Sequence, residues 1–233
     1  MDVLVVDVGG THVKVIATGV DEPRRHPSGP DLTPETLVTI VRETAADWHY
    51  DVVSLGYPGA VDSTGPRAEP GNLADGWVGF DFASAFGVPV RVVNDAVMQA
   101  LGGYDGGRML FLGLGTGLGS ALVTEHVVVP LELGCLPYGD GSTIAERLGR
   151  AGLEEDGITE WQHAVGEVTD VLRTAFAADY VMLGGGNAER VDPLPPKTKR
   201  GGNDDAFTGG FRLWEEMVEP HDRRPPAVWR VVR

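Results

Sequence analysis

The segment DVGGTHVK, residues Asp7–Lys14, decides how this chain is interpreted. It follows the apolar run Val3–Val6 and leads into an alternating segment that ends at Ala17, which predicts a strand, a tight turn and a second strand. Its two glycines let the backbone turn tightly and present N–H groups to a phosphate, while Lys14 supplies a cation and Asp7 an oxygen ligand for Mg²⁺. A plain β-hairpin with a surface lysine explains the segment equally well when it is considered alone.

A second glycine-rich turn, GLGTGLGS at Gly113–Ser120, again separates two apolar segments, Met109–Leu114 and Ser120–Val129. Two such turns, one in each half of the chain, indicate a phosphate-chain site much more specifically than either turn alone. A third turn, Gly184–Gly186, follows a predicted buried strand at Tyr180–Leu183, and its bare backbone would let a base or ribose approach. A turn that simply leads into a helix explains this third segment about as well.

The repeated strand–turn–strand pattern predicts two lobes built on one plan. We expect an N-terminal lobe over residues 1–104, a C-terminal lobe over 105–218 and a tail over 219–233. Strands that alternate with helices indicate an α/β fold. The other expected elements are strands over Asp51–Tyr57 and Val88–Val93, and helices over Pro34–Trp48, Thr143–Leu148, Thr159–Ala178 and Ala206–Val218, with a further helix that ends at Tyr104. We expect a loop or an irregular edge over Asp21–Pro30 and a loop over Asp192–Asp205.

The composition is that of an ordinary globular chain, with 233 residues of which 42% are hydrophobic and 23% charged. These values exclude collagen-like, coiled-coil and wholly disordered chains, and a net charge of −15 argues against a general nucleic-acid binder. No apolar stretch approaches the roughly 18 residues of a membrane span, and no basic leader precedes the first strand, so we expect a cytoplasmic protein. The single Cys135 cannot form an internal disulfide, and no cluster of Cys and His predicts zinc.

Asp95 is the candidate general base, because it follows an apolar strand at the sheet edge where α/β proteins bind ligands. A carboxylate there can accept the proton of an attacking hydroxyl during phosphoryl transfer. Asn94 or Asp95 can instead cap the helix that follows, and the two residues can divide these roles. Asn72, Glu132 and Glu146 are candidate ligands of sugar hydroxyls, although each one singly is better explained as a turn asparagine or a solvated glutamate.

Taken in order, these motifs resemble those of the ROK family of sugar kinases and repressors, within the actin-like, ribonuclease-H-like ATPase superfamily. The similar segments are Asp7–Lys14 (family DxGGTxxK), Gly56–Asp62 (GxPGxVD), Gly71–Leu73 with Trp77, Val93–Ala96 (NDA), Gly115–Ser120 (GTGxGS), Leu131–Gly134 (most of ExGH) and Leu183–Asn187 (GGG turn). The resemblance runs from residue 3 to residue 218. The chain most resembles the polyphosphate glucokinases, through Asn72–Gly79 and the spacing from Glu132 to Glu146.

The resemblance implies a two-lobed fold, with mixed sheets flanked by helices and a cleft between the lobes. It also implies a phosphotransferase that moves a terminal phosphoryl group from ATP or polyphosphate to the 6-hydroxyl of glucose or a related hexose, in a homodimer without zinc. Asp95 would be the general base, and Asp7 would hold Mg²⁺ directly or through water. By the same match the sugar ligands are Asn72, Asn94, Glu132 and Glu146, and the donor ligands are Gly9, Gly10, Thr11, Lys14, Gly115, Thr116, Gly117, Gly184, Gly185 and Gly186.

Three features depart from the family pattern. Cys135 stands where the family has a histidine that contacts the sugar, which puts sugar affinity and sugar choice in question. The segment between the second strand and the first helix is short, so we expect the first lobe to lack a strand. The tail at 219–233 carries arginines outside the family pattern, and we expect it to be solvated rather than an oligomer or donor contact.

The donor is open between ATP and polyphosphate. Lys197, Lys199 and Arg200 form a basic run beyond the third turn that can track a long anionic donor, and a solvated loop explains them at least as well. A sugar-binding protein without turnover is the alternative function, and a phosphate-chain hydrolase is a third. Asp95 argues against the former, and the sugar ligands argue against the latter. A DNA-binding repressor is not expected, because the first strand begins at residue 3.

Overall fold

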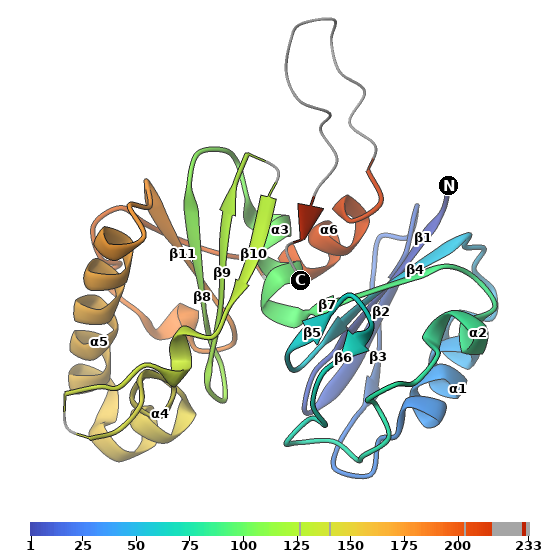
Figure 1. Cartoon of the computed structure of the whole chain (residues 1–233), viewed down its shortest axis with the longest axis horizontal. Coiled ribbons are helices and arrows are strands. Elements are labelled where there is room, and N and C mark those ends of the chain that lie inside the picture. The colour runs from blue at the N-terminus through green and yellow to red at the C-terminus, as the bar shows by residue number, and fades with distance from the viewer. Residues whose placement is uncertain (126, 140, 203, 216–229, 232–233) are drawn as a thin grey trace, which may run out of the picture. The chain divides into compact units, whose positions relative to one another are not determined.

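The computed structural model describes residues 1–125, 127–139, 141–202, 204–215 and 230–231. The chain divides into two compact units (Figure 1). The first contains Met1–Met98 and the segment that begins at Ala206, and the second contains Gln99–Asp205 and a short strand near the C-terminus. Each unit is a mixed sheet flanked by helices, which confirms the predicted α/β class. Within the described residues, no helix is long and apolar enough to cross a membrane.

The first unit is built on a five-stranded sheet in the order β3-β2-β1-β4-β7. Strand β2 is antiparallel to its two neighbours, whereas β1, β4 and β7 are parallel to one another. The three parallel strands therefore end at one edge of the sheet, where their polar residues gather. The strands are β1 (Val3–Val8), β2 (His12–Ala17), β3 (Arg24–Pro27), β4 (Val52–Tyr57) and β7 (Val90–Asn94), beside a separate hairpin of β5 (Val61–Asp62) and β6 (Gly65–Pro66).

One face of this sheet is covered by α1 (Pro34–Thr44) and α2 (Phe82–Phe86). Helix α1 begins where the Thr33 hydroxyl oxygen accepts the Thr36 N–H at 3.2 Å, a capping bond that satisfies one free donor of the first turn. Its apolar stripe then packs into the core formed by β1, β2 and β4.

The opposite face carries α6 (Asp205–Arg212) and the start of α3 (Asp95–Gly103). Gly210 of α6 lies so close to Val5 that a β-carbon would clash with the valine side chain. The Gly210 carbonyl also accepts the hydroxyl of the buried Ser54 at 2.6 Å. These contacts seat α6 on the central strands β1 and β4.

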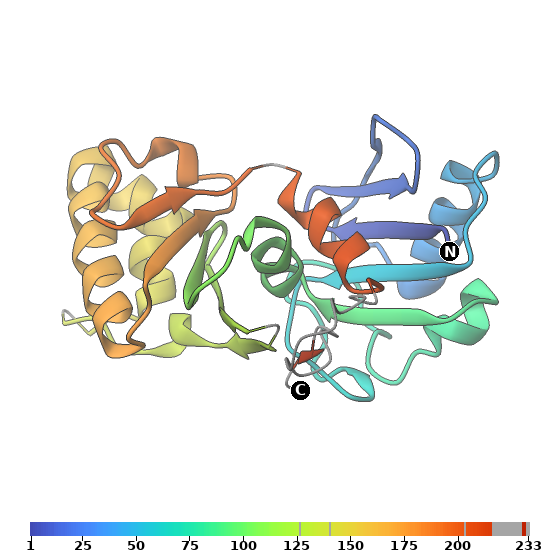
Figure 2. The same ribbon diagram turned by 90° about the horizontal axis from the view of Figure 1, so that it is seen from above.

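The second unit is built on a six-stranded sheet in the order β12-β11-β8-β9-β10-β13. Helix α5 (Arg150–Ala175) lies along one face of it, as Figure 2 shows, and buries Trp161, whose indole N–H donates to the Leu148 carbonyl at 3.0 Å. The strands are β8 (Met109–Leu114), β9 (Leu118–Thr124), β10 (Val127–Leu131), β11 (Tyr180–Gly184), β12 (Thr198–Arg200) and β13 (Arg230–Val231), with helix α4 (Ile144–Leu148) and 3-10 turns at Leu133–Cys135 and Ala188–Arg190.

Several expected elements are corrected by the structure. The expected strand Ser120–Val129 is two strands, β9 and β10, because the backbone reverses at Glu125, which has a φ of 45°. The expected helix Thr159–Ala178 begins earlier, at Arg150, and is kinked at Gly157. The part before the kink has no regular apolar stripe, so periodicity does not reveal it.

Edge strands occur in two segments for which no regular strand was expected: β3 lies in the segment expected to be a loop or an irregular edge, and β12 in a segment expected to be a loop. All four residues of β3 are exposed, so the alternation of apolar and polar residues that signals a strand is missing. The expectation that the first lobe lacks a strand here is wrong, because β3 pairs with β2 in an antiparallel ladder. The sequence pattern does not reveal strand β12 for a similar reason, because this strand is short, polar and largely exposed.

The division of the chain also differs from the expected lobes. The expected boundary after residue 104 falls at Met98–Gln99, and part of the segment expected in the second lobe, 206–218, lies in the first unit. The reason is the packing of α6 on β1 and β4, which no local sequence pattern encodes. Residues 216–218 and the expected tail, 219–233, lie outside the described residues, apart from β13.

Candidate active site

Asp7 and Lys14 form a largely buried charged pair at the end of the first hairpin. They face each other across the β1–β2 ladder, and Lys14 Nζ lies 3.3 Å from Asp7 Oδ2. The side chains are only 11% and 31% exposed, respectively. Asp7 Oδ1 accepts no hydrogen bond from the described residues, and it faces Gly56, which carries no side chain. A carboxylate with one oxygen unshared is the donor that Mg²⁺ takes together with substrate phosphates, so Asp7 fits such an ion.

The turn after β1 presents backbone N–H groups. The Gly9 N–H closes the turn on the His12 carbonyl at 3.0 Å, whereas the N–H groups of Gly10 and Thr11 donate to no acceptor among the described residues. Gly10 also packs against Asn72, because a β-carbon at this position would overlap the Asn72 amide. A predicted donor ligand and a predicted sugar ligand are thus brought side by side within one unit.

Side chains of the core hold the loop that carries Asn72. Trp77 is fully buried, and its ring centroid lies 5.4 Å from that of Tyr57. The Tyr57 hydroxyl donates to the Ala68 carbonyl at 2.8 Å, and burial, followed by the charge of Glu69, raises the pKa of Tyr57. The Glu69 carboxylate accepts the backbone N–H of Trp77 at 2.9 Å. Sequence patterns do not single out Glu69, because a glutamate in a polar loop is ordinarily solvated.

Asn94 takes one of the two roles predicted for Asn94 and Asp95, the capping of helix α3. Asn94 Oδ1 accepts the N–H groups of Ala96 and Val97 at 2.9 and 3.3 Å and so caps α3, while its Nδ2 donates to the Gly59 carbonyl at 2.9 Å. Asp95 is half-buried at the end of β7, with Oδ1 2.8 Å from the Ala96 N–H. Asn94 therefore caps the helix and ties β7 to the segment after β4, and the Asp95 carboxylate adds a contact within the same first turn.

The second turn, Gly115–Gly117, is held through its carbonyl groups. The Arg150 N–H at the start of α5 donates to the carbonyls of Gly115 and Thr116 at 3.1 and 3.2 Å. Gly149 permits this approach, since a β-carbon there would lie 2.5 Å from the Thr116 oxygen. The N–H groups of Thr116 and Gly117 donate to no acceptor within the part of the chain that the structure describes. As in the first unit, they remain available to a phosphate.

The three glycines of the third turn are explained by different contacts. A β-carbon at Gly184 would lie 2.6 Å from the ring of the core residue Phe111. Gly185 has a φ of 77° and lies against the Leu114 backbone. A β-carbon at Gly186 would meet open space. Gly184 and Gly185 are therefore needed by the packing itself, and Gly186 is the one that leaves room for a ligand.

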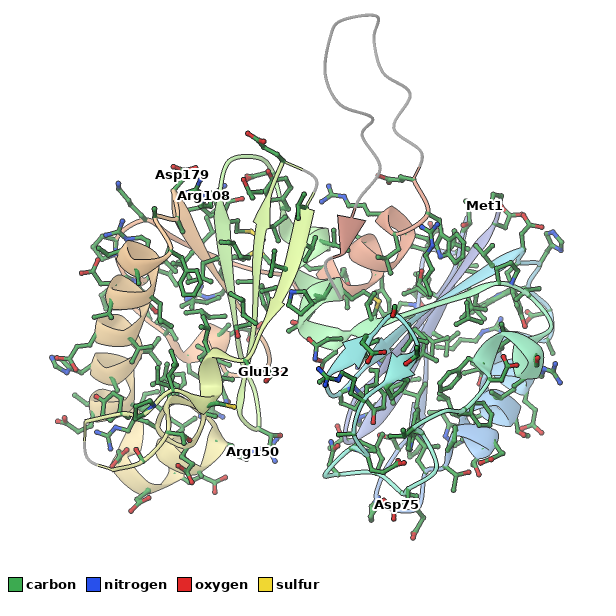
Figure 3. The ribbon with its side chains drawn as sticks, in the orientation of Figure 1. Met1, Asp75, Arg108, Glu132, Arg150 and Asp179 are labelled. Atoms are coloured by element: carbon green, nitrogen blue, oxygen red, sulfur yellow. The ribbon has the colours of Figure 1, made fainter. Side chains whose placement is uncertain are left out.

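Glu132, Cys135 and Glu146 lie at the same end of the second unit's sheet as the second turn, because β10 ends beside the start of β9 (Figure 3 labels Glu132). Glu132 and Cys135 are exposed. Glu146 forms a capping box with Thr143 at the start of α4: its Oε2 accepts the Thr143 N–H and hydroxyl, both at 2.8 Å. The structure thus assigns this glutamate a capping contact in addition to its predicted place near the sugar.

The basic run expected to track a long donor is largely engaged in structural contacts. Lys199 Nζ lies 2.5 Å from Asp105 Oδ2, and the hydrogen bond from Lys199, followed by that from the Tyr180 hydroxyl, lowers the pKa of the Asp105 carboxyl group. The Arg200 guanidinium donates to two backbone carbonyls, one of them that of Ala188 just after the third turn, at 3.2 Å. Only Lys197 of the three has no side-chain partner among the described residues, and it lies at the far end of β11 from the glycine turn.

Known sugar kinases resemble this chain in sequence and in fold. No family model matches it. A polyphosphate glucokinase of Mycobacterium tuberculosis is 25% identical over 216 residues, which cover 82% of this chain and 80% of the relative. The fold resembles that of the inorganic polyphosphate/ATP-glucomannokinase from Arthrobacter sp. strain KM, with a TM-score of 0.76, 23% identity, and coverage of 90% of this chain and 96% of that one.

A ROK family glucokinase from Streptomyces griseus gives a TM-score of 0.69 at 18% identity, over 90% of this chain and 98% of that one. At such identities the two structures establish the shared fold alone. The sequence match adds a relationship to the polyphosphate glucokinases. The chain is therefore a glucokinase-like protein with the fold of the ROK sugar kinases, related to the polyphosphate glucokinases.

Proposed function

We propose that the protein transfers the terminal phosphoryl group of ATP or polyphosphate to the 6-hydroxyl of glucose or a related hexose. The observation that carries this proposal is the carboxyl edge of the first unit's sheet. The ends of β1, β4 and β7 place a charged pair, a glycine turn and the Asn94–Asp95 segment along that edge. An edge of this kind is where α/β sheets bind ligands. The related polyphosphate glucokinases supply the substrate class.

In this mechanism Asp95 accepts the proton of the sugar 6-hydroxyl as the oxygen attacks the terminal phosphorus. Asn94 acts mainly by fixing the end of β7, since its amide oxygen already caps α3. Asn72 is held against Gly10 and binds another sugar hydroxyl beside the first phosphate turn. Glu132 and Glu146 are the sugar ligands that the second unit contributes.

The donor is held by backbone N–H groups and by Lys14. The proposed donors to phosphate oxygens are the N–H groups that have no acceptor among the described residues, those of Gly10 and Thr11 in one turn and of Thr116 and Gly117 in the other. Asp7 would hold Mg²⁺, which supplies neutralisation of phosphate charge when it is bound. Gly186 provides the open backbone position on the nucleotide side.

The test is production of sugar 6-phosphate from glucose, with Mg-ATP and Mg-polyphosphate in parallel, for the wild type and for Asp95→Asn. We expect turnover by the wild type and a loss of about 10²–10⁴-fold in kcat for the variant, the usual contribution of a general base. Asparagine keeps the shape of the side chain, and circular dichroism and glucose affinity serve as folding controls. A variant with full activity would refute the role of Asp95.

A sugar-binding protein without turnover is the second candidate, and the exposed Cys135 in place of the family histidine is the observation that favours it. It predicts measurable binding of glucose by calorimetry, with no sugar phosphate formed from either donor across a panel of hexoses. Release of phosphate from the donor without any sugar product would instead indicate a hydrolase.

A further inference from the structure

The cations of the second unit differ in whether their side chains already have partners. Three of them sit in ion pairs: Arg147 with Asp156, Arg173 with Asp170 and Lys199 with Asp105. Two more donate to backbone carbonyls, Arg108 and Arg200. The remaining arginines and lysines between Gln99 and Asp205 have no side-chain partner among the described residues, and they are Arg150, Arg190 and Lys197.

Arg150 is the one of these three whose backbone is fixed to the second turn. Its N–H is shared between the carbonyls of Gly115 and Thr116, and the preceding Gly149 makes that approach possible. The side chain is exposed, and Figure 3 shows it at the end of the unit where the β8–β9 hairpin turns. The Arg150 side chain is therefore an exposed cation on a residue whose backbone is hydrogen-bonded to the turn that carries the N–H groups of Thr116 and Gly117.

We propose that Arg150 binds the donor phosphates that lie upstream of the transferred one, and so favours donors with a long phosphate chain. The turn itself contains only uncharged residues, Gly115–Gly117, so its N–H groups alone provide no full positive charge. A guanidinium forms paired, charge-assisted hydrogen bonds with phosphate oxygens, which backbone amides cannot match. The ligand class is an extended polyphosphate, and this assignment rests on the proposed function.

Lys197 offers a matched control. It is exposed, cationic and without a side-chain partner among the described residues, as Arg150 is. Its carbonyl accepts the Val181 N–H near the start of β11, at the opposite end of the sheet from the glycine turns. Lys197→Gln thus removes the same charge from the same unit without touching the second turn.

The experiment measures binding of tripolyphosphate and of long-chain polyphosphate to the full chain, by calorimetry with Mg²⁺ at low ionic strength. The variants are Arg150→Gln, Arg150→Lys and Lys197→Gln. We expect Arg150→Gln to weaken binding about tenfold, the usual effect of losing a charge-assisted hydrogen bond, and Lys197→Gln to weaken it less than about twofold. Arg150→Lys should lie between, since lysine keeps the charge and loses the paired geometry.

Kinetics then separate this inference from the proposed function. In an active enzyme, Arg150→Gln should raise the donor KM, more for long polyphosphate than for ATP, and leave the glucose KM unchanged. Equal effects of Arg150→Gln and Lys197→Gln, or no tripolyphosphate binding by the wild type, would overturn the assignment. If no hexose is phosphorylated and Arg150→Gln still weakens tripolyphosphate selectively, the assignment of Arg150 stands and the proposed function fails.

Discussion

The two units contain the same strand–turn–strand hairpin but obtain their charge differently. In the first hairpin the pair next to the last one is Asp7 and Lys14, an acid opposite a base. In the second hairpin the corresponding pair is Gly113 and Gly119, which carry no side chains at all. Both turns present backbone N–H groups. In the first unit the strands of the hairpin also supply charged side chains, whereas in the second unit any charged side chain beside the turn has to come from outside the hairpin.

This difference indicates a division of labour. A carboxylate of this kind can hold a metal ion, and the lysine beside it can neutralise phosphoryl charge, so under the proposed function the first hairpin would take the reacting end of the donor. The second hairpin has no such charged pair. Its glycines instead allow close packing, with the Phe111 ring against Gly113 and Gly184. Four mutational experiments would break or sharpen the comparison, and the one with the largest expected effect comes first.

Replacing Lys14 with methionine removes the cation that only the first hairpin has. We expect kcat to fall about 100-fold through lost transition-state charge stabilisation, and the free energy of unfolding to fall by about 1–3 kcal/mol, because Asp7 is left largely buried and unpaired. Steady-state kinetics and urea unfolding measure the two effects. The double variant Asp7→Asn/Lys14→Met should regain stability and remain inactive, and unchanged turnover in Lys14→Met would remove the proposed distinction between the hairpins.

Alanine in each turn tests whether only the first is coupled to the sugar. In Gly10→Ala the new β-carbon displaces the Asn72 amide, and we expect the glucose KM to rise about tenfold, the effect of one lost hydrogen bond. Stability should change little, because the end of an exposed side chain moves easily. In Gly115→Ala the β-carbon meets open space, so the glucose KM should stay the same. Equal glucose KM values for the two variants would argue against the coupling.

Glu146 allows a capping role to be separated from a sugar-binding role. Glu146→Ala should lower the free energy of unfolding by about 1 kcal/mol, because the capping box at Thr143 is lost. Glu146→Gln can preserve the box, so thermal unfolding should be near that of the wild type. If glutamine nevertheless raises the glucose KM, the carboxylate binds sugar. If only alanine affects the KM, the residue acts through the helix start.

The smallest expected effect is that of Cys135→His, which restores the family residue to an exposed position. Histidine adds a ring that forms ordinary hydrogen bonds, whereas the cysteine thiol is only a weak hydrogen-bond donor and acceptor. We expect the glucose KM to fall between about twofold and tenfold, the value of one neutral hydrogen bond. Cys135→Ala serves as the size control. A KM that stays unchanged or rises would contradict the alignment of Leu131–Gly134 with the family motif.

The fold was largely predictable because its central strands are almost entirely buried and therefore predominantly apolar. Strands β1, β4, β8 and β11 are recognisable from composition alone, and the glycine turns mark their ends. The exposed strands β3 and β12 were not predictable, since an edge strand with both faces in solvent has no alternation. The reversal at Glu125 was missed because an apolar run on both sides hides a turn made by a non-glycine residue.

For the candidate site, the sequence by itself determined which residue types are available and where strands deliver them, because motif spacing follows the chain. Only the tertiary structure decided how those residues are used. It assigned the helix cap to Asn94, a capping contact to Glu146 and ion pairing to Lys199, and it seated α6 on the first unit. It also placed Arg150 against the second turn. Such outcomes depend on partners distant in the sequence, which compete for each side chain only after the chain has folded.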